Sequence, residues 1–411
     1  MIGRIRSLLQ IQNYSMYVVM MLMIGISMAL TSPYLSLYCT KVIGISPGSY
    51  GLLMALVALS GVLINTILAK YSDNGMNRKM VIIIAVLFYA SGYITFLLIH
   101  NYVILLIAIP LLMGLGAPAV PQIFAAAREA VNTSETVNST FANSLLRSLF
   151  SMGFLVGPLV GSILLTGFGY EGVFLGTFSG FIGIAVLVLV LLRQGQGVGI
   201  KPTVNVRSIQ NIEGGHIGLR NKYVLLPFIT LILLNMCNVA YNLNIPLFVV
   251  NELHGTNTQA GWVISLSAGL EIPLMIGLGG VAARIGNKKM MLIGGSVDVV
   301  YHLIVLNSTA LWQILAGQLL QASFVAMVIA IALSYFQDLL PTLPGLATIL
   351  YMNASTLGQL LGNLSGGWVA ELAGSRNVSW MCLGLLVVSL ILLTRTKATL
   401  VPSRQSTQTM I

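Results

Sequence analysis

Two ionisable side chains lie within long apolar stretches of this 411-residue chain. Arg147 lies in NSLLRSLFSMGFLVGPLVGS (143–162) and Glu271 in GWVISLSAGLEIPLMIG (261–277). Each stretch could cross a bilayer, where a charge at the centre costs roughly 3 kcal/mol on insertion scales. Both side chains should therefore face protein or a water-filled cavity. They could form an ion pair that breaks when a proton or a ligand arrives, since a nearby arginine favours an ionised carboxylate. The alternative is a static pair that orients two helices.

A second ionisable pair, Asp298 and His302, is four residues apart in another apolar stretch. Residues at this spacing share one face of a helix and can touch. A histidine beside a carboxylate could relay protons near neutral pH. The two side chains could equally form a local polar pair that faces neighbouring helices, and the sequence leaves both interpretations open.

The composition indicates what kind of protein holds these groups. Hydrophobic residues make up 57% of the chain and charged residues only 7%, against about 25% charged in soluble domains. The chain is therefore an integral membrane protein. The excess of 20 Lys and Arg over 10 Asp and Glu is explained by cytoplasmic loops and not by nucleic-acid binding. The three cysteines stand singly, without paired spacing, so neither disulfides nor a metal site is indicated and no cofactor is expected.

Apolar windows predict an all-α membrane protein with twelve transmembrane helices. The predicted spans are 16–38, 49–69, 80–99, 102–126, 138–166, 171–192, 223–250, 259–283, 289–307, 311–336, 345–371 and 377–394. A polar, glycine-rich interval separates the first six from the last six. This predicts a six-helix bundle over 1–192, a linker over 193–222, and a second six-helix bundle with a tail over 223–411.

The basic residues indicate the orientation of the chain. Nearly all Lys and Arg fall on the side of the predicted membrane that holds the termini and the linker, and the other side has only Lys41 and Arg376. Because cytoplasmic loops are enriched in Lys and Arg, both termini should be cytoplasmic.

Features of the first half recur in the second at a nearly constant offset. Arg78-Lys79 is matched by Lys288-Lys289, Pro33 by Pro246, and the series Gly153/Gly157/Gly161 by Gly358/Gly362/Gly366. Glycines four residues apart share a helix face, where another helix can approach closely. These matches favour a duplicated, pseudo-symmetric unit. Parallel repeats of this kind place a substrate site between the halves near the membrane midplane.

Several motifs resemble known transporters. Asp73 followed by Arg78-Lys79 is similar to the loop motif between spans two and three of the major facilitator superfamily, although Ala69 stands where its first glycine is expected. GxxxGPxxG at 153–161 resembles the span-five motif of proton-coupled exporters. LAKYSDNGMNRKM, PQIFAAARE, GLEIPLMI and FQDLLP resemble the bacterial sugar efflux transporter family, and this resemblance extends over nearly the whole chain up to Thr396.

The resemblance implies a proton-coupled secondary transporter that exports small sugars or glycosides, such as lactose, glucose or thiogalactosides, by alternating access. It implies a multi-pass protein of the bacterial cell membrane whose partners are a sugar, protons and the lipid bilayer, with a monomer expected. Spans five and eight face each other across the halves in this superfamily, which would let Arg147 and Glu271 pair. It also implies a cytoplasmic gate that fastens the halves in one state, formed by Asp73, Arg78, Lys79, Arg128 and Glu129, although the positive-inside rule accounts for Arg78 and Lys79 equally well. Asp338 with Lys288-Lys289 is the expected equivalent in the second half.

A sugar site needs uncharged hydrogen-bonding groups and an aromatic face. Asn235, Asn238 and Asn242 form one stripe in span seven, with Tyr241 beside it. Further candidates are the amides Gln122, Asn143, Gln318, Gln321, Asn353 and Gln359 and the rings of Tyr34 and Trp262. For each amide the alternative is a hydrogen bond between helices, and for each ring a place at the membrane interface.

Two other functions remain open at this point. A multidrug/proton antiporter would share the span-five motif but have a more apolar cavity. An intramembrane enzyme acting on a lipid or sugar-lipid would use one of the two ionisable pairs as its acid and base. The sequence has no G-x-x-x-x-G-K-[ST] motif, which argues against ATP-driven pumping by this chain.

Overall fold

The computed structural model describes residues 8, 10, 11, 13–72, 77–132, 139–191, 221–341 and 343–396, and all regular secondary structure within them is helical. The first half contains α2 (Tyr14–Lys41), α3 (Pro47–Ser72), α4 (Arg78–Leu98), α5 (Tyr102–Gly116), α6 (Ala119–Asn132) and α7 (Ser139–Leu191). The second half contains α9 (Lys222–Asn251), α10 (Asn257–Ile285), α11 (Asn287–Asn307), α12 (Leu311–Phe324), α13 (Ala332–Leu339), α14 (Pro344–Ala373) and α15 (Val378–Thr394), with a π-helix at Val325–Ile329 and a 3-10 turn at Ser375–Asn377.

Local backbone breaks divide some of these segments. Gly169 has φ 65° and ψ −163°, so α7 consists of two helices joined at this residue. Glycine tolerates the positive φ because it has no Cβ. A two-residue turn at Ala117 and Pro118 separates α5 from α6, and the proline cannot donate the backbone hydrogen bond that would continue the helix.

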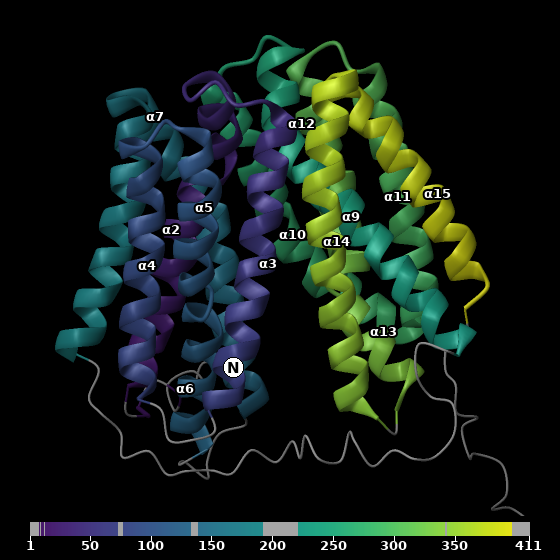
Figure 1. Cartoon of the computed structure of the whole chain (residues 1–411). Coiled ribbons are helices and arrows are strands. Elements are labelled where there is room, and N and C mark those ends of the chain that lie inside the picture. Colours follow the sequence, from purple (N-terminus) through teal and green to yellow (C-terminus); the bar gives the residue numbers. More distant parts are fainter. Residues whose placement is uncertain are drawn as a thin grey trace, which may run out of the picture.

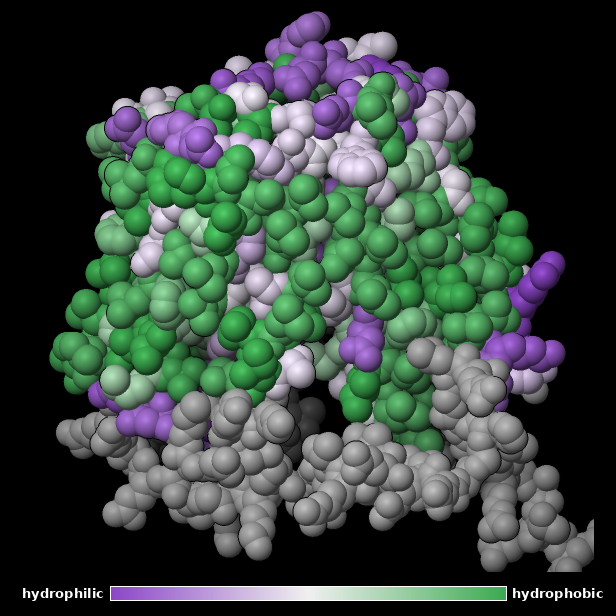
Figure 2. Space-filling view, in the orientation of Figure 1, coloured by the Kyte–Doolittle hydropathy of each residue, from purple (hydrophilic) through white to green (hydrophobic). Residues whose placement is uncertain are grey.

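The helices form two bundles that lie side by side, one for each half of the sequence (Figure 1). One core is built almost wholly from α2 to α7, and a second core lies within α9 to α15. Side chains on the outer surface form a broad apolar belt with hydrophilic residues above it (Figure 2). Among the described residues, nine helical stretches are long and apolar enough to cross a membrane. The chain is a multi-pass membrane protein.

The two glycine series act as predicted. A Cβ added to Gly153 would lie 2.5 Å from backbone atoms of Gly25 and Ile26, and one added to Gly157 would lie 2.8 Å from the carbonyl oxygen of Ile26. The glycines of α7 therefore let the backbone of α2 approach. In the second half, a Cβ on Gly362 would lie 2.7 Å from the carbonyl oxygen of Met236, so α14 packs against α9 in the same way.

Polar contacts at the ends of α4 and α11 also repeat between the halves. Arg78 at the start of α4 binds Glu129 near the end of α6, and Asn287 at the start of α11 donates to Asp338 near the end of α13. The lysine that follows each of these residues donates a hydrogen bond to a carbonyl oxygen near the end of the last helix of its own bundle. Lys79 donates to Leu189 in α7, and Lys288 donates to Thr394 in α15. All three correspondences have one common offset (78 to 287, 79 to 288 and 129 to 338). In the structure Arg78 therefore corresponds to Asn287, and not to Lys288 as the sequence predicted. The shared offset supports a duplicated six-helix unit.

The halves meet where α3 begins and α14 ends. The backbone NH of Gly48 donates to Glu371 Oε2 at 2.9 Å. A Cβ on Gly367 would lie 2.5 Å from the carbonyl oxygen of Pro47 and 2.9 Å from Cα of Gly51. Backbone atoms of the two bundles are therefore in direct contact at this end of their boundary.

Candidate functional site

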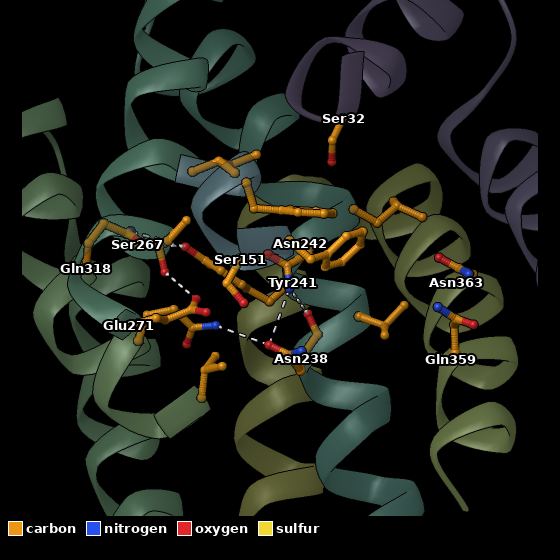
Figure 3. A pocket seen from close by; sticks show the side chains of 18 of the residues that line it. Ser32, Ser151, Asn238, Tyr241, Asn242, Ser267, Glu271, Gln318, Gln359 and Asn363 are labelled. Carbon is orange, nitrogen blue, oxygen red and sulfur yellow. Dashed lines mark hydrogen bonds between the residues drawn. The ribbon is translucent and has the colours of Figure 1, made fainter. Parts of the chain in front are cut away.

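A cavity of about 500 Å³ lies between the bundles, below the contact of α3 with α14. Helices of both halves line it, although the second half supplies most of the side chains (Figure 3). The polar lining consists of Ser32, Tyr50, Ser151, Asn238, Tyr241, Asn242, Ser267, Glu271, Gln318, Gln321, Gln359 and Asn363. Among the described residues that line it, none is Lys, Arg or His. The surface is hollowed between the halves in the lower part of Figure 2.

Glu271 is the single carboxylate among the described residues of this lining. It projects from α10, and the hydroxyl of Ser267, one turn earlier, donates to its Oε1 at 3.3 Å. In the described part of the chain, no cationic group lies within 4.0 Å of its carboxylate. Helical spacing explains the arrangement, because residues four apart lie on one face.

Arg147 does not contact Glu271 in this structure. Its side chain is exposed and has no ion pair with any described residue. It is one turn before Ser151 and shares a face of α7 with Phe150 and Ser151, both of which line the cavity. The predicted pair is therefore open here, with the arginine one helical turn from the lining.

The amide stripe predicted in span seven lies in the cavity wall. Asn242 Nδ2 donates to the carbonyl oxygen of Asn238 at 2.9 Å and to its Oδ1 at 3.3 Å, and Gln321 Nε2 donates to the same Oδ1 at 3.4 Å. Asn242 is exposed to the cavity. Asn235 in the same stripe is buried and donates to the carbonyl oxygen of Leu231. Its hydrogen bond is therefore within α9, and the residue is not part of the cavity lining.

Tyr241 borders the cavity but is only 5% exposed, and its ring packs against Tyr301 and His302 inside the second bundle. Its hydroxyl lies 2.7 Å from the hydroxyl of Tyr301, and Gln318 Nε2 donates to these two hydroxyl oxygens at 3.1 and 3.0 Å. Gln318 also donates to the carbonyl oxygen of Ile314 and is fully buried. Gln318 borders the cavity, and in this structure its amide is hydrogen-bonded to Tyr241, Tyr301 and its own helix, so its role as a direct ligand stays a prediction.

Several predicted substrate residues do not line the cavity. Tyr34 is fully buried and donates to the carbonyl oxygen of Pro158 at 3.0 Å, so it ties α2 to α7. Trp262 is 46% exposed and Asn353 is exposed, and both lie outside the lining. Gln122 accepts a hydrogen bond from Arg78. The side chain of Asn143 is outside the described residues.

Asp298 and His302 also lie away from this cavity. They are on α11, each 1% exposed, with Asp298 Oδ2 at 3.8 Å from His302 Nε2. The rings of Tyr241 and Tyr301 pack edge-on against the imidazole. The two side chains are therefore close together, as their spacing predicts, but they are enclosed in the second bundle.

Of the predicted gate residues, the structure describes contacts of Arg78, Lys79 and Glu129. Arg78 makes a bidentate contact with Glu129, with Nε at 2.9 Å from both carboxylate oxygens and Nη2 at 2.6 Å from Oε1. Both residues belong to the first half, so in this state the contact joins α4 to α6 and does not fasten the two halves. Lys79 likewise donates within its own half. Asp73 and the side chain of Arg128 lie outside the described residues.

Sequence reasoning missed five polar residues of the lining: Ser32, Tyr50, Ser151, Ser267 and Asn363. Helical spacing could have found three of them. Ser151 follows Arg147 by four residues, Ser267 precedes Glu271 by four, and Asn363 follows Gln359 by four, which places each on the face of a recognised candidate. Ser32 and Tyr50 lack this signal, because no predicted site residue lies three or four positions away from either of them.

Two helical bundles that enclose a polar cavity within an apolar belt define a membrane transporter. The sequence matches the Major Facilitator Superfamily over residues 17–297 and 227–409. It is 33% identical to sugar efflux transporter A of Dickeya chrysanthemi over 359 residues, 87% of this chain and 88% of the relative. It is 30% identical to sugar efflux transporter C of Escherichia coli K12, over 90% of this chain and 92% of the relative.

The solved structure of the nucleoside transporter NupG shares the fold, with a TM-score of 0.74 and 14% identity over 94% of this chain and all of that one. The chain belongs to the major facilitator superfamily and, within it, to the sugar efflux transporter family. It is therefore a transporter and not an enzyme, which removes the intramembrane-enzyme alternative.

Proposed function

We propose that this protein is a proton-coupled secondary transporter that exports small neutral sugars or glycosides by alternating access across the bacterial plasma membrane. The observation that carries the proposal is the cavity lining, which combines amides, hydroxyls and aromatic rings with one carboxylate and no cation among the described residues. The relatives that cover most of this chain are named sugar efflux transporters.

The lining suits a neutral sugar better than other solutes. Asn238, Asn242 and Gln359 can donate and accept hydrogen bonds, and a wrong ligand would leave such groups unpaired, at about 1–3 kcal/mol each. The rings of Phe150 and Phe154, which line the cavity and are half-buried, offer apolar faces for a sugar ring. A cavity of about 500 Å³ falls within the usual range for small-molecule sites. A phosphorylated sugar would find a carboxylate and, among the described lining residues, no basic partner.

We also propose twelve membrane spans. The nine apolar stretches reach that number when the helices on either side of Gly169 are counted separately and when α10 and α14, of 29 and 30 residues, are included. Arg78, Lys79 and Lys288 mark one end of the bundles, and Lys41 and Arg376 lie at the other. By the positive-inside rule the first end is cytoplasmic, so the contact of α3 with α14 closes the outer side and the cavity opens inward.

Glu271 is the proposed proton carrier because it is the only carboxylate among the described residues that line the cavity. Its protonated form would remove a buried charge when the cavity closes around a sugar. Arg147, one turn from the lining, would pair with the ionised form in another state of the cycle. We assign no proton step to Asp298 and His302, because they do not line the cavity. A monomer suffices, since one chain forms the whole cavity, and no nucleic-acid partner is proposed.

The test is flux in proteoliposomes with an imposed pH gradient. Radiolabelled lactose should accumulate against its gradient in wild-type vesicles, and Glu271→Gln should lose this pH-driven accumulation while retaining equilibrative lactose exchange. Glu171→Gln, which alters an exposed carboxylate next to the break in α7, is the matched control and should behave as wild type. Unchanged accumulation by Glu271→Gln would refute the carrier role. A cationic dye that moves in preference to lactose would instead support the multidrug antiporter.

A further inference from the structure

Three side chains with sulfur and nitrogen donors converge inside the second bundle, apart from the cavity. Cys237 on α9, His302 on α11 and Cys382 on α15 are at most 1% exposed. Their donor atoms all lie within 4.8 Å of one another, and Cys237 Sγ is 3.5 Å from His302 Nε2. Three helices that are distant in sequence thus bring two thiols and an imidazole to one point.

A fourth donor adjoins this group. Asp298, one turn before His302, places Oδ2 at 3.8 Å from both Cys237 Sγ and His302 Nε2. Its other oxygen, Oδ1, is buried and has no hydrogen-bond partner among the described residues. A carboxylate in such a place is costly unless it is paired or coordinates a metal.

We propose that Cys237, His302 and Cys382 bind one Zn²⁺ ion and that Asp298 supplies the fourth ligand. Structural zinc sites are closed, tetrahedral and built from Cys, His and Asp or Glu. Bond lengths of about 2.0–2.3 Å in a tetrahedron separate the donors by roughly 3.3–3.8 Å. The observed separations of 3.5–4.8 Å therefore need only small side-chain adjustments. Zn²⁺ would displace the two thiol protons, and the two thiolates with the Asp298 carboxylate would then more than balance its charge, leaving the site with a net charge of −1.

The site would stabilise one wall of the cavity. It would connect α9, α11 and α15 at a point where the imidazole of His302 packs edge-on against Tyr241, with ring centroids 5.9 Å apart. Tyr241 in turn lines the cavity. The metal is thus a structural element of the second bundle, which distinguishes this proposal from the proton chemistry at Glu271.

The test is metal analysis of the full-length protein, purified in detergent without a polyhistidine tag from cells grown with added zinc. We expect about one zinc per chain in wild type and less than one tenth of that in Cys237→Ser and Cys382→Ser. Cys39→Ser is the matched control, because Cys39 is also a fully buried cysteine but lies on α2 in the first bundle. It should retain the zinc of wild type.

A second measurement keeps the proposal testable if the variants fold poorly. X-ray absorption at the zinc edge of wild-type protein should show two sulfur ligands at about 2.3 Å with nitrogen or oxygen at about 2.0–2.2 Å. Wild type without stoichiometric zinc, zinc bound only by nitrogen and oxygen, or a Cys237–Cys382 disulfide found by mass spectrometry would each overturn the proposal. Protein from zinc-depleted cells should also have a lower unfolding temperature than zinc-replete protein, and Cys237→Ser should abolish that difference.

Discussion

Replacing Gly367 by alanine should open the outer side of the transporter. The added Cβ would lie 2.5 Å from the carbonyl oxygen of Pro47 and 2.9 Å from Cα of Gly51. Both neighbours are backbone atoms, so α3 and α14 must separate by several tenths of an ångström to restore ordinary contact. The cavity below stays intact, because Gly367 lies outside its lining.

The magnitude follows from the cost of overpacking, which is typically about 1–3 kcal/mol. This cost applies only to the state in which α3 and α14 touch. The population of that state relative to an outward-open state should therefore fall by a factor of roughly 5 to 150, since 1.4 kcal/mol is a tenfold change. The gain in helix propensity from glycine to alanine, about 1 kcal/mol, applies to both states and cancels.

The assay uses Ser32→Cys, which places a thiol in the cavity lining. The three native cysteines are fully buried and should react little. A membrane-impermeant maleimide added from the outside should label Ser32→Cys slowly, and adding Gly367→Ala should raise the rate by roughly tenfold. Gly384→Ala is the control, because a Cβ at Gly384 meets no atom within 4 Å. Equal outside labelling in the two double variants would refute closure by this contact.

Three further predictions concern the site and its frame. Tyr241→Phe removes a hydroxyl that is hydrogen-bonded to Tyr301 and Gln318, which should lower the free energy of unfolding by about 1–3 kcal/mol. It should also raise the KM for lactose more than it lowers kcat. Transport kinetics in vesicles test this, with Tyr351→Phe as the control. Arg78→Ala breaks a contact whose side chains are 25% and 43% exposed, so it should destabilise the protein by only about 1 kcal/mol, and an unchanged unfolding temperature would contradict this. Glucose 6-phosphate should not compete with lactose, since no described basic side chain lines the cavity; competition at equal concentration would show that the lining is incomplete.

Patterns within one helix were predictable from the sequence, because helical spacing fixes which residues share a face. The series of Gly153 and the series of Gly358 each mark the line along which another helix approaches, and the structure confirms both. The stripe of Asn238 and Asn242 likewise lies together in the cavity wall. Such patterns need no knowledge of where neighbouring helices stand.

Predictions that combined residues of different helices were less successful. Tyr34 and Trp262 have the right side chains for stacking on a sugar, yet neither lines the cavity. Tyr34 instead donates to a carbonyl oxygen of α7. The direction of a side chain around its helix depends on the rotation of that helix in the bundle, and the chemical type of the residue does not reveal this rotation.

The same limit explains why depth alone could not settle the pairing of Arg147 with Glu271. Counting residues at 1.5 Å each places both near the middle of the membrane, but two side chains at equal depth meet only if their helices also bring the two faces together. In this state the faces of α7 and α10 approach at Leu155 and Gly269, whereas Arg147 is one helical turn before the lining residue Ser151. A pair that forms elsewhere in the cycle would require α7 to move relative to α10. The mobile element of the proposed mechanism is therefore the contact between these two helices, since the carboxylate is already held by Ser267 in its own helix.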